Sequence, residues 1–234
     1  MQTCLQIIQS AAKRLNIPAP TAAFSSQDQS ILQLVELCNE EGQLQANRYQ
    51  WQVLQKEATF TTLAAQIQST LASITTGLDY VVNDTIWNRT LRRPVYGPRT
   101  QQAWQQQKAI QLNGPFNSYR IINDVINFYP NPAAGQLCYF EYITKNWVTT
   151  ATGTSSTWTA DTDTPVLDDQ LIILGLIWRW KAAKGLEYSE DYEKYESLIM
   201  NRMSRDGVRE TLNMAGASFD IQPVVLIPAG NWNV

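Results

Sequence analysis

The sequence predicts an α+β fold in which N- and C-terminal helices form a helical bundle, with a central antiparallel β region and an extended C-terminal tail. Both ends of the chain place apolar residues three and four positions apart, between residues that typically begin and end helices. The middle of the chain alternates apolar and polar residues and contains paired runs around short turns. The expected boundaries are 1–50 for the N-terminal helices, 51–163 for the β-rich region, 164–207 for a C-terminal helical hairpin and 208–234 for the tail.

Two helices are expected in the N-terminal region. The first covers residues 3–15 and stops before Pro18, because a residue that precedes proline avoids helical geometry. Ser25 or Ser26 is placed to cap the second helix, which is expected to continue to Tyr49. These helices supply the first half of the predicted bundle.

The clearest strands of the β-rich region flank Asn123 and Asp124. These two residues tolerate positive φ and suit a two-residue hairpin turn between strands over 119–122 and 125–129. Further strands are expected over residues 83–89 and 137–148. The region should therefore form an antiparallel sheet.

A short helix and a long loop complete the β-rich region. Residues 100–110 are expected to form the helix, with glutamines facing solvent around Trp104. Residues 149–164 are rich in Thr, Ser and Gly, which predicts a loop or an irregular hairpin with Trp158 as its anchor.

The C-terminal hairpin carries clear signals for the beginning and end of each helix. Thr164 is placed to cap the first helix and Pro165 fits its first position, where a missing N–H costs nothing. Residues 171–178 are apolar on every side, so this helix should be surrounded by protein. Gly185 should end it, and Ser189 can cap the next helix. The apolar stripe of that second helix consists of Tyr188, Tyr192, Tyr195, Ile199 and Met203.

The composition excludes several classes of enzyme. With 44% hydrophobic residues the chain can bury a core, and its formal net charge of −3 argues against general nucleic-acid binding as its main task. It contains no histidine, which excludes histidine-based triads and zinc sites, and it has no glycine-rich phosphate-binding motif. We therefore expect no cofactor, no metal and no enzymatic activity. Three widely spaced cysteines are expected to be buried, reduced thiols: Cys4, Cys38 and Cys138.

Pairs of acidic residues were considered as candidates for a glycosidase site, which needs two carboxylates in a cleft. Two pairs lie on predicted helices, where a surface position or pairing with the helix dipole is the favoured interpretation: Glu40 with Glu41, and Asp168 with Asp169. Asp161 and Asp163 alternate as calcium ligands do, but Pro165 interrupts the pattern. A turn ahead of the C-terminal hairpin explains them better.

Four arginines cluster around Pro94 and have two interpretations. They can contact phosphate or line a path for DNA, or they can form forked contacts with carboxylates across a protein interface, which is the favoured interpretation. The four residues are Arg89, Arg92, Arg93 and Arg99.

The C-terminal tail combines prolines and glycines with a short apolar run. Such a segment can add a strand to an edge or fill a groove on a partner or a neighbouring subunit, and docking on its own domain is the equally weighted alternative. The expected partner-binding residues are Val224, Val225, Leu226, Ile227 and Trp232.

The segment LDDQLIILGLIWRWKAAKGLEYSEDYEKYE, residues 167–196, resembles the C-terminal helical pair of bacteriophage head-to-tail adaptors, also called head completion or tail tubular A-type proteins. The resemblance extends upstream through NDTIWNRTLRRPVYGPRTQQAW at 83–104, FYPNP at 128–132 and FEYITKNWV at 140–148, in the order that the family shows. It covers most of the chain, and none of these motifs is a catalytic signature.

This resemblance implies a structural virion protein. Head-to-tail adaptors form a ring, commonly of twelve subunits, under the portal protein; they present a surface to the tail nozzle or another tail component, and double-stranded DNA passes through the centre. The chain would then lie in the neck of the virion after synthesis in the host cytoplasm, with no membrane involved. By the same resemblance the helices form the ring body, the tail contacts the portal, and the 149–164 loop with Trp158 faces tail components.

Two alternatives from other classes remain at this point. The first is a nucleic-acid-binding virion protein that uses the basic patch from Arg89 to Arg99. The second is an acid-pair hydrolase in which the β region binds a sugar. The sequence leaves open the subunit number, the tail partner and whether the free protein is a monomer.

Overall fold

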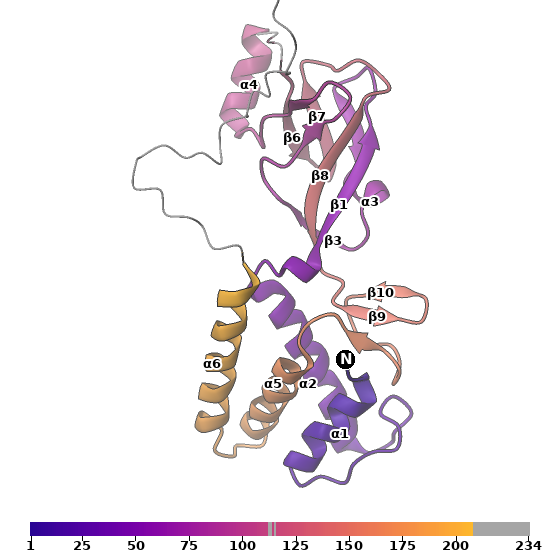
Figure 1. Ribbon diagram of the computed structural model, residues 1–234, viewed down its shortest axis with the longest axis vertical. Coiled ribbons are helices and arrows are strands. Elements are labelled where there is room, and N and C mark those ends of the chain that lie inside the picture. Colours follow the sequence, from indigo (N-terminus) through magenta and orange to yellow (C-terminus); the bar gives the residue numbers. More distant parts are fainter. Residues whose placement is uncertain (112–113, 115, 208–234) are drawn as a thin grey trace, which may run out of the picture.

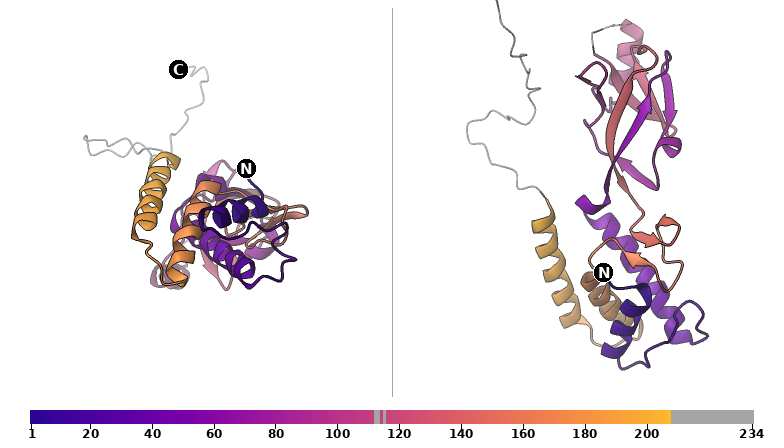
Figure 2. Two further views of the ribbon diagram at one scale, coloured as in Figure 1. Left: turned by 90° about the horizontal axis from the view of Figure 1, so that it is seen from below. Right: turned by 45° about the vertical axis from the view of Figure 1, so that its right-hand side comes forward.

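The structure is a computed structural model that describes residues 1–111, 114 and 116–207. The molecule is elongated, with a helical part at one end and a β part at the other (Figure 1), and a second side view shows the same division (Figure 2). Its helices and antiparallel strands confirm the predicted α+β class. The tail predicted over 208–234 lies outside the described residues.

Four long helices form the helical part. They pack around one apolar core, and each of α1, α2 and α6 contacts α5. Their bounds are α1 Cys4–Arg14, α2 Gln29–Arg48, α5 Asp169–Ala183 and α6 Ser189–Asp206. Among the described residues, no helix is long and apolar enough to cross a membrane.

The β part contains two sheets and two short helices. Its elements are β1 Gln55–Thr61, β2 Ile67–Thr70, α3 Leu71–Ile74, β3 Leu78–Val81, β4 Trp87–Asn88, β5 Arg93–Pro94, α4 Gln101–Ile110, β6 Ser118–Ile122, β7 Val125–Tyr129 and β8 Leu137–Thr144. A single turn of helix, η1 Gln52–Leu54, leads into β1. Beside the helical part lies a small third sheet, made of β9 Val148–Thr150, β10 Gly153–Ser155 and β11 Thr164–Pro165.

The two N-terminal helices lie where the sequence predicts, but the cap of α2 differs. Thr3 caps α1 and forms a capping box with Gln6. The cap of α2 is Asp28, whose Oδ1 accepts from the Ser30 N–H at 2.9 Å, so the predicted serine caps are wrong. Ser26 instead accepts a hydrogen bond from the Asp28 N–H, which steadies the turn before the helix.

The C-terminal hairpin forms as predicted, although its first helix begins later than expected and its second helix begins one residue earlier. Thr164 and Pro165 do not start α5, because they pair with β9 as an extended strand; Asp168 caps the helix instead. Gly185 has φ +66, and the N–H of the residue after it reaches back to the Lys181 carbonyl, as in a Schellman helix end. Ser189 is the first residue of α6 rather than its cap.

The apolar stripe of α6 faces α5 as expected. Tyr195 and Ile199 are buried in the helical core. Tyr188 and Tyr192 are each 41% exposed, and both rings contact the Trp178 indole of α5. The stripe therefore attaches α6 along its inner face while leaving two tyrosines at the surface.

Strand β8 organises the larger sheet. It pairs along its length with β1, and β3 and β4 share its other edge. The predicted strand over 83–89 is limited to Trp87–Asn88, and the predicted strand over 137–148 ends at Thr144 because the chain bends before entering β9.

The predicted hairpin is confirmed as β6 and β7. Asn123 and Asp124 have φ of 49° and 61°, the conformation that a two-residue turn of this type requires. A parallel bridge between Tyr96 and Ser118 joins this second sheet to the segment that follows β5. The two sheets face each other across a core that includes Phe60, Phe128 and Phe140.

The two parts meet where the chain crosses between them. Ile143, near the end of β8, belongs to the helical core, whereas the adjacent Tyr142 belongs to the β core. On the other crossing, Trp51 and Leu54 are buried in the helical core just before β1 begins. Both crossings are therefore anchored by buried side chains.

Candidate interaction surfaces

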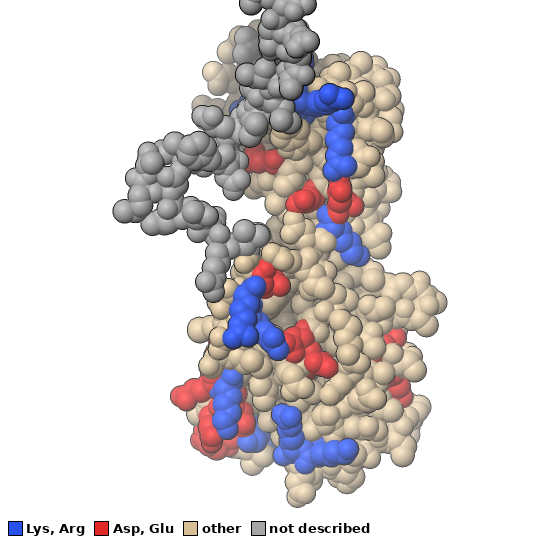
Figure 3. All heavy atoms as spheres, in the orientation of Figure 1, with Lys and Arg blue, Asp and Glu red and all other residues tan. Residues whose placement is uncertain are grey.

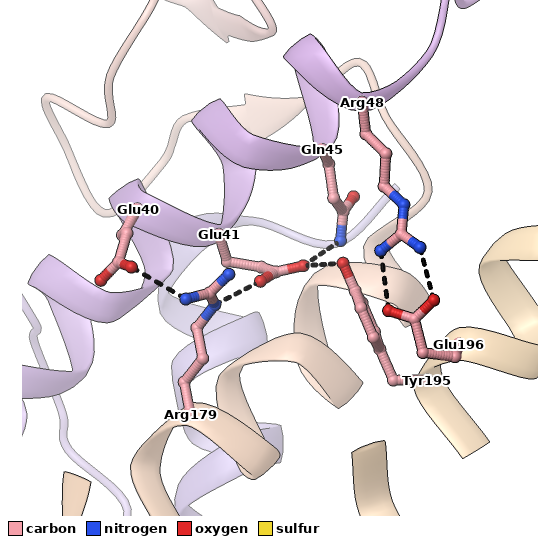
Figure 4. Close-up of polar contacts among 7 residues, drawn as sticks. All are labelled: Glu40, Glu41, Gln45, Arg48, Arg179, Tyr195 and Glu196. Carbon is pink, nitrogen blue, oxygen red and sulfur yellow. Dashed lines mark hydrogen bonds and ion pairs between the residues drawn. The ribbon is translucent and has the colours of Figure 1, made fainter. Parts of the chain in front are cut away.

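A buried carboxylate lies at the centre of the helical part. Glu41 of α2 is fully buried, and its Oε1 accepts from the Tyr195 hydroxyl of α6 at 2.6 Å and from Gln45 Nε2 at 2.7 Å. Its Oε2 accepts from Arg179 Nε of α5 at 2.5 Å (Figure 4). One side chain therefore joins three helices, and we call these four residues the Glu41 hub.

Neighbouring residues make room for the hub and extend it. A Cβ on Gly175 of α5 would lie 2.2 Å from the Glu41 carboxyl carbon, so only glycine leaves space for the carboxylate at that crossing. Glu40 binds the other side of Arg179 at 2.8 Å, from a position where its side chain is 54% exposed. Glu40 thus fits the predicted surface role.

The sequence interpretation of Glu41 as a surface residue is wrong. Burial is possible because two donors from other helices, Arg179 and Tyr195, reach the carboxylate once the chain has folded. Burial and then the Glu41 charge raise the pKa of the Tyr195 hydroxyl, so that it stays a donor. The one feature of the sequence that could have indicated the burial of Glu41 is Gly175, a glycine within an otherwise apolar helix.

The predicted arginine cluster lies on the surface of the β part. Arg89 and Arg92 occupy the turn between β4 and β5, Arg93 begins β5, and Arg99 follows a few residues later; all four are exposed. Arg89 forms an ion pair with Glu57, and its guanidinium lies 3.5 Å from the centre of the Tyr139 ring. The structure therefore places three of the arginines around one turn.

Arg99 is connected to the same surface through the backbone. Its N–H donates to the Tyr119 carbonyl of β6 at 2.9 Å, and the Tyr96 N–H donates to the Asn117 carbonyl at 3.0 Å. Tyr96 in turn packs edge-on against Phe116, whose ring lies 5.9 Å from the Arg93 guanidinium. Arg93 and the exposed rings of Tyr96 and Phe116 thus lie next to one another on the β part.

Trp158 is buried, which agrees with its predicted role as the anchor of the 149–164 loop. It is 3% exposed, and its ring packs edge-on against Trp147 with 5.1 Å between centroids. The backbone N–H of Trp158 donates to Asn39 Oδ1 of α2 at 2.9 Å. The side chain anchors residues 149–164 to the helical core, and whether the surrounding loop faces the tail stays a prediction. Residues 224–227 and Trp232 lie outside the described residues.

The polar groups with catalytic potential are engaged in structural contacts. Asp161 accepts from the N–H groups of Ala23 and Phe24, and Asp163 accepts from those of Thr159 and Ala160. In the part of the chain that the structure describes, no three His, Cys, Asp or Glu side chains could together hold a metal ion. The turn interpretation of the two aspartates is confirmed.

The three cysteines are free and buried, as expected. Burial raises the pKa of the Cys38 thiol and of the Cys138 thiol to about 12, and it also raises the pKa of Cys4. Thiols with raised pKa are poor nucleophiles at neutral pH. These residues are part of the two cores.

One hollow of about 250 Å³ lies at the junction of the two parts. It is lined by Trp51 and Val53 on one side and by Arg202 and Asp206 of α6 on the other. Arg202 pairs with Asp168 at 2.6 Å, and the Asp206 carboxylate accepts from the Gln52 N–H at 2.8 Å. These contacts bring the end of α6 to the junction.

Comparison with known proteins gives one informative match. No curated protein matches the chain. The family model described as SU10 adaptor protein matches residues 2–218, which is nearly the whole chain. This confirms the resemblance to bacteriophage adaptors, and the family description indicates a structural virion component that binds other virion components. The chain belongs to the SU10 adaptor protein family.

Proposed function

We propose that this chain is a head-to-tail adaptor that forms a closed ring, of about the twelve subunits common in such adaptors, between the portal and the tail machinery. The observation that carries the proposal is the family match over residues 2–218. In this role the helical part forms the ring body, the β part extends along the axis, and double-stranded DNA passes through the centre. The protein binds and positions its partners and needs no reaction centre.

The helical part has the properties that a ring body requires. A ring closes only if every subunit presents its two contact faces at a fixed angle. The Glu41 hub fixes α2, α5 and α6 relative to one another through directional bonds. A second contact, Arg48 with Glu196, joins α2 to α6 nearer the junction. Helix positions set by such bonds support a constant subunit angle.

The C-terminal tail is well placed to reach a partner. Helix α6 ends at the junction between the two parts, where Asp206 accepts from the Gln52 N–H. The 27 residues that follow Gly207 can span at most about 90 Å when extended. This reach covers a neighbouring subunit or the portal, and we propose that residues 224–227 and Trp232 make that contact.

The test is a phage whose gene for this chain is interrupted, with the chain supplied again from a plasmid. We expect the interrupted phage to accumulate heads without tails, because no adaptor joins the two. The intact chain should restore tailed particles, whereas a chain ending at Gly207 should not. Normal tailed particles in the absence of the chain would refute the proposed function.

Single substitutions in the tail of the full-length chain test the role of the tail independently of the rest of the chain. Ile227→Asp should impair the attachment of tails, because it places a charge in the apolar run, whereas Asn213→Asp adds the same charge to the tail away from that run and from Trp232. Equal behaviour of the two variants would argue against the tail as the contact. That result would not bear on the ring proposal, which the phage with the interrupted gene tests.

A further inference from the structure

We propose that one side of the β part binds an acidic face of another virion protein. The surface is defined by Arg92, Arg99 and Lys108 together with the exposed rings of Trp87, Tyr96 and Phe116, and we call it the basic patch. The inference rests on the proposed adaptor function, and it names the chemistry of one partner.

The charge of this region differs from that of the remaining chain. Residues 85–123 contain six cations and no Asp or Glu, although the whole chain has a formal net charge of −3. The other 195 residues therefore carry 12 cations and 21 carboxylates. The six cations are Arg89, Arg92, Arg93, Arg99, Lys108 and Arg120. Such a local excess attracts an anionic partner and repels a cationic one.

The elements that carry these cations lie side by side. Strands β4 and β5 pair with each other, and the segment after β5 runs along β6 through backbone hydrogen bonds. Helix α4 lies against the same strand, where the Ser118 hydroxyl donates to Gln107 at 2.7 Å. These contacts place the elements of the run next to one another, and Asp84, just outside the run, shares a surface hollow with Tyr96 and Arg99.

The basic patch lies on the half of the β part that is farther from the helices. Strand β1 leaves the junction at Gln55 and ends at Thr61, which pairs with Leu137 at the start of β8. Strand β4 pairs with the two residues after Leu137, so the turn that carries Arg92 is near this distal end. On the face shown in Figure 3, basic side chains lie toward the upper end of the β part, with acidic side chains directly below them.

Exposed aromatic rings favour a protein partner over DNA. Trp87 and Tyr96 are each 41% exposed and Phe116 is 42% exposed, all within the basic patch. Aromatic residues and arginine are enriched in the centres of protein interfaces, whereas contacts to the DNA backbone come mainly from charged and polar groups. Arg89 is also already paired with Glu57. No ion pair joins Arg92 or Arg99 to a carboxylate within the described ranges.

In the proposed ring, a second copy of the chain does not fit as the partner. The chain does have a complementary surface in the first turns of α6, which carry Glu190, Asp191 and Glu193. Because α6 ends at the junction, those acids lie about 20–24 Å away along the helix, at the end opposite the β part (Figure 1). Neighbours in a closed ring have equal height, so the basic end of one subunit cannot meet the acidic end of the next.

The test is photo-cross-linking in purified particles that carry the full chain. A p-benzoylphenylalanine at Leu91, which is 44% exposed in the turn between β4 and β5, is the probe of the basic patch. We expect an adduct with a peptide of another virion protein that is rich in Asp and Glu. The double variant Arg92→Glu/Arg99→Glu should reduce this adduct by about tenfold, because attraction becomes repulsion.

Matched controls separate charge from folding. Lys13→Glu/Arg14→Glu makes the same change in net charge at exposed positions of α1 and should leave the adduct within about twofold. Replacing carboxylates of the cross-linked peptide by lysine should restore the adduct of the double variant. Adducts with DNA or with a second copy of this chain, or an adduct that the double variant leaves unchanged, would overturn the inference.

A second probe position makes the two proposals distinguishable. A p-benzoylphenylalanine at Met200 of α6, which is 63% exposed, reports on the helical part. If the adaptor function holds and the basic patch inference fails, Met200 gives adducts with virion proteins while Leu91 gives none. If the adaptor function itself fails, neither position gives an adduct with a portal or tail protein.

Discussion

The helical part and the β part solve the problem of a fixed geometry in different ways. The helical part has a carboxylate at its centre, bound by donors from three helices. The β part has an apolar core built from Phe60, Phe128, Phe140 and their neighbours, and backbone ladders set the register of its strands. Helices lack such ladders between them, so the packing of side chains in the apolar core, together with the bonds of the Glu41 hub, defines how they cross.

This difference indicates which residues of each part can change without loss of its geometry. In the β part, backbone pairing fixes the strands whatever side chains face outward, so its surface is free to carry arginines and aromatic rings. In the helical part, the hub constrains residues on α2, α5 and α6 together, because each unpaired member would leave a buried polar group. The first arrangement suits a surface adapted to a partner, and the second suits a repeated ring body.

The largest expected effect is that of Glu41→Ala. It removes the acceptor of three donors, leaves the Arg179 charge without its buried partner and opens a cavity, so we expect a loss of about 3–5 kcal/mol in the free energy of unfolding. Chemical denaturation measures the loss, and hydrogen exchange locates it. Protection should fall in α2, α5 and α6 and persist in β7 and β8.

Two controls make this prediction specific. Glu40→Ala removes the partly exposed carboxylate on the same arginine and should cost less than about 1 kcal/mol. Phe128→Ala should cost about 3–5 kcal/mol as well, but with protection lost in the β part. Equal costs for Glu40→Ala and Glu41→Ala would contradict the hub as the centre of the helical part.

Gly175→Ala is expected to have the next largest effect. The new methyl group would lie 2.2 Å from the Glu41 carboxyl carbon, so α2 and α5 must separate or the carboxylate must leave its donors. Overpacking of this kind costs about 1–3 kcal/mol, measured by thermal or chemical unfolding. Gly114→Ala, where nothing lies within 4 Å of the added carbon, is the matched control. A stabilised Gly175→Ala protein would show that the close approach is not needed.

Alkaline pH should weaken both the helical part and the β part. Groups whose pKa is raised by folding stabilise the protein below their unfolded pKa, and that contribution is lost as pH rises toward the folded value. The helical part contains Cys4, Cys38 and Tyr195 with raised pKa, and the β part contains Cys138, Tyr119 and Tyr80.

For Cys38 and Cys138 the window lies between pH 9 and about 12. Each thiol should then remove about 1 kcal/mol of stability per pH unit within its window. Hydrogen exchange of the parent protein and of the Cys38→Ala and Cys138→Ala variants, measured at a series of pH values, reports this loss in each part. Flat profiles for both variants and the parent protein would contradict burial as the cause.

The smallest expected effect is that of Arg89→Ala in the β part. Its ion pair with Glu57 joins side chains that are 55% and 48% exposed, and such pairs contribute about 0–1 kcal/mol. Chemical denaturation of Arg89→Ala should therefore show a loss of less than about 1 kcal/mol in the free energy of unfolding. A loss comparable to that of Glu41→Ala would mean that the β part also depends on a polar contact.

Local signals allowed most elements to be predicted from the sequence. Asn123-Asp124 identifies the hairpin because positive φ at two successive residues is a local property. Gly185 identifies the end of α5 for the same reason. The cap at Thr164 failed because pairing with β9 depends on residues that follow β8, which periodicity within a segment cannot report.

The sites were less predictable than the fold. The arginine cluster could be found because its members are close in sequence. The Glu41 hub could not, because its donors come from residues 45, 179 and 195, and only the fold brings them together. The burial of Trp158 likewise depends on Trp147 and α2. Contacts between distant segments were thus the main source of error.

Electron cryo-microscopy of purified particles tests the central claim most directly. The account predicts a closed ring of this chain between the portal and the tail, with the helical parts forming the wall and the basic patch against a different protein. Particles in which the chain is absent from the neck, or lies along packaged DNA, would contradict it.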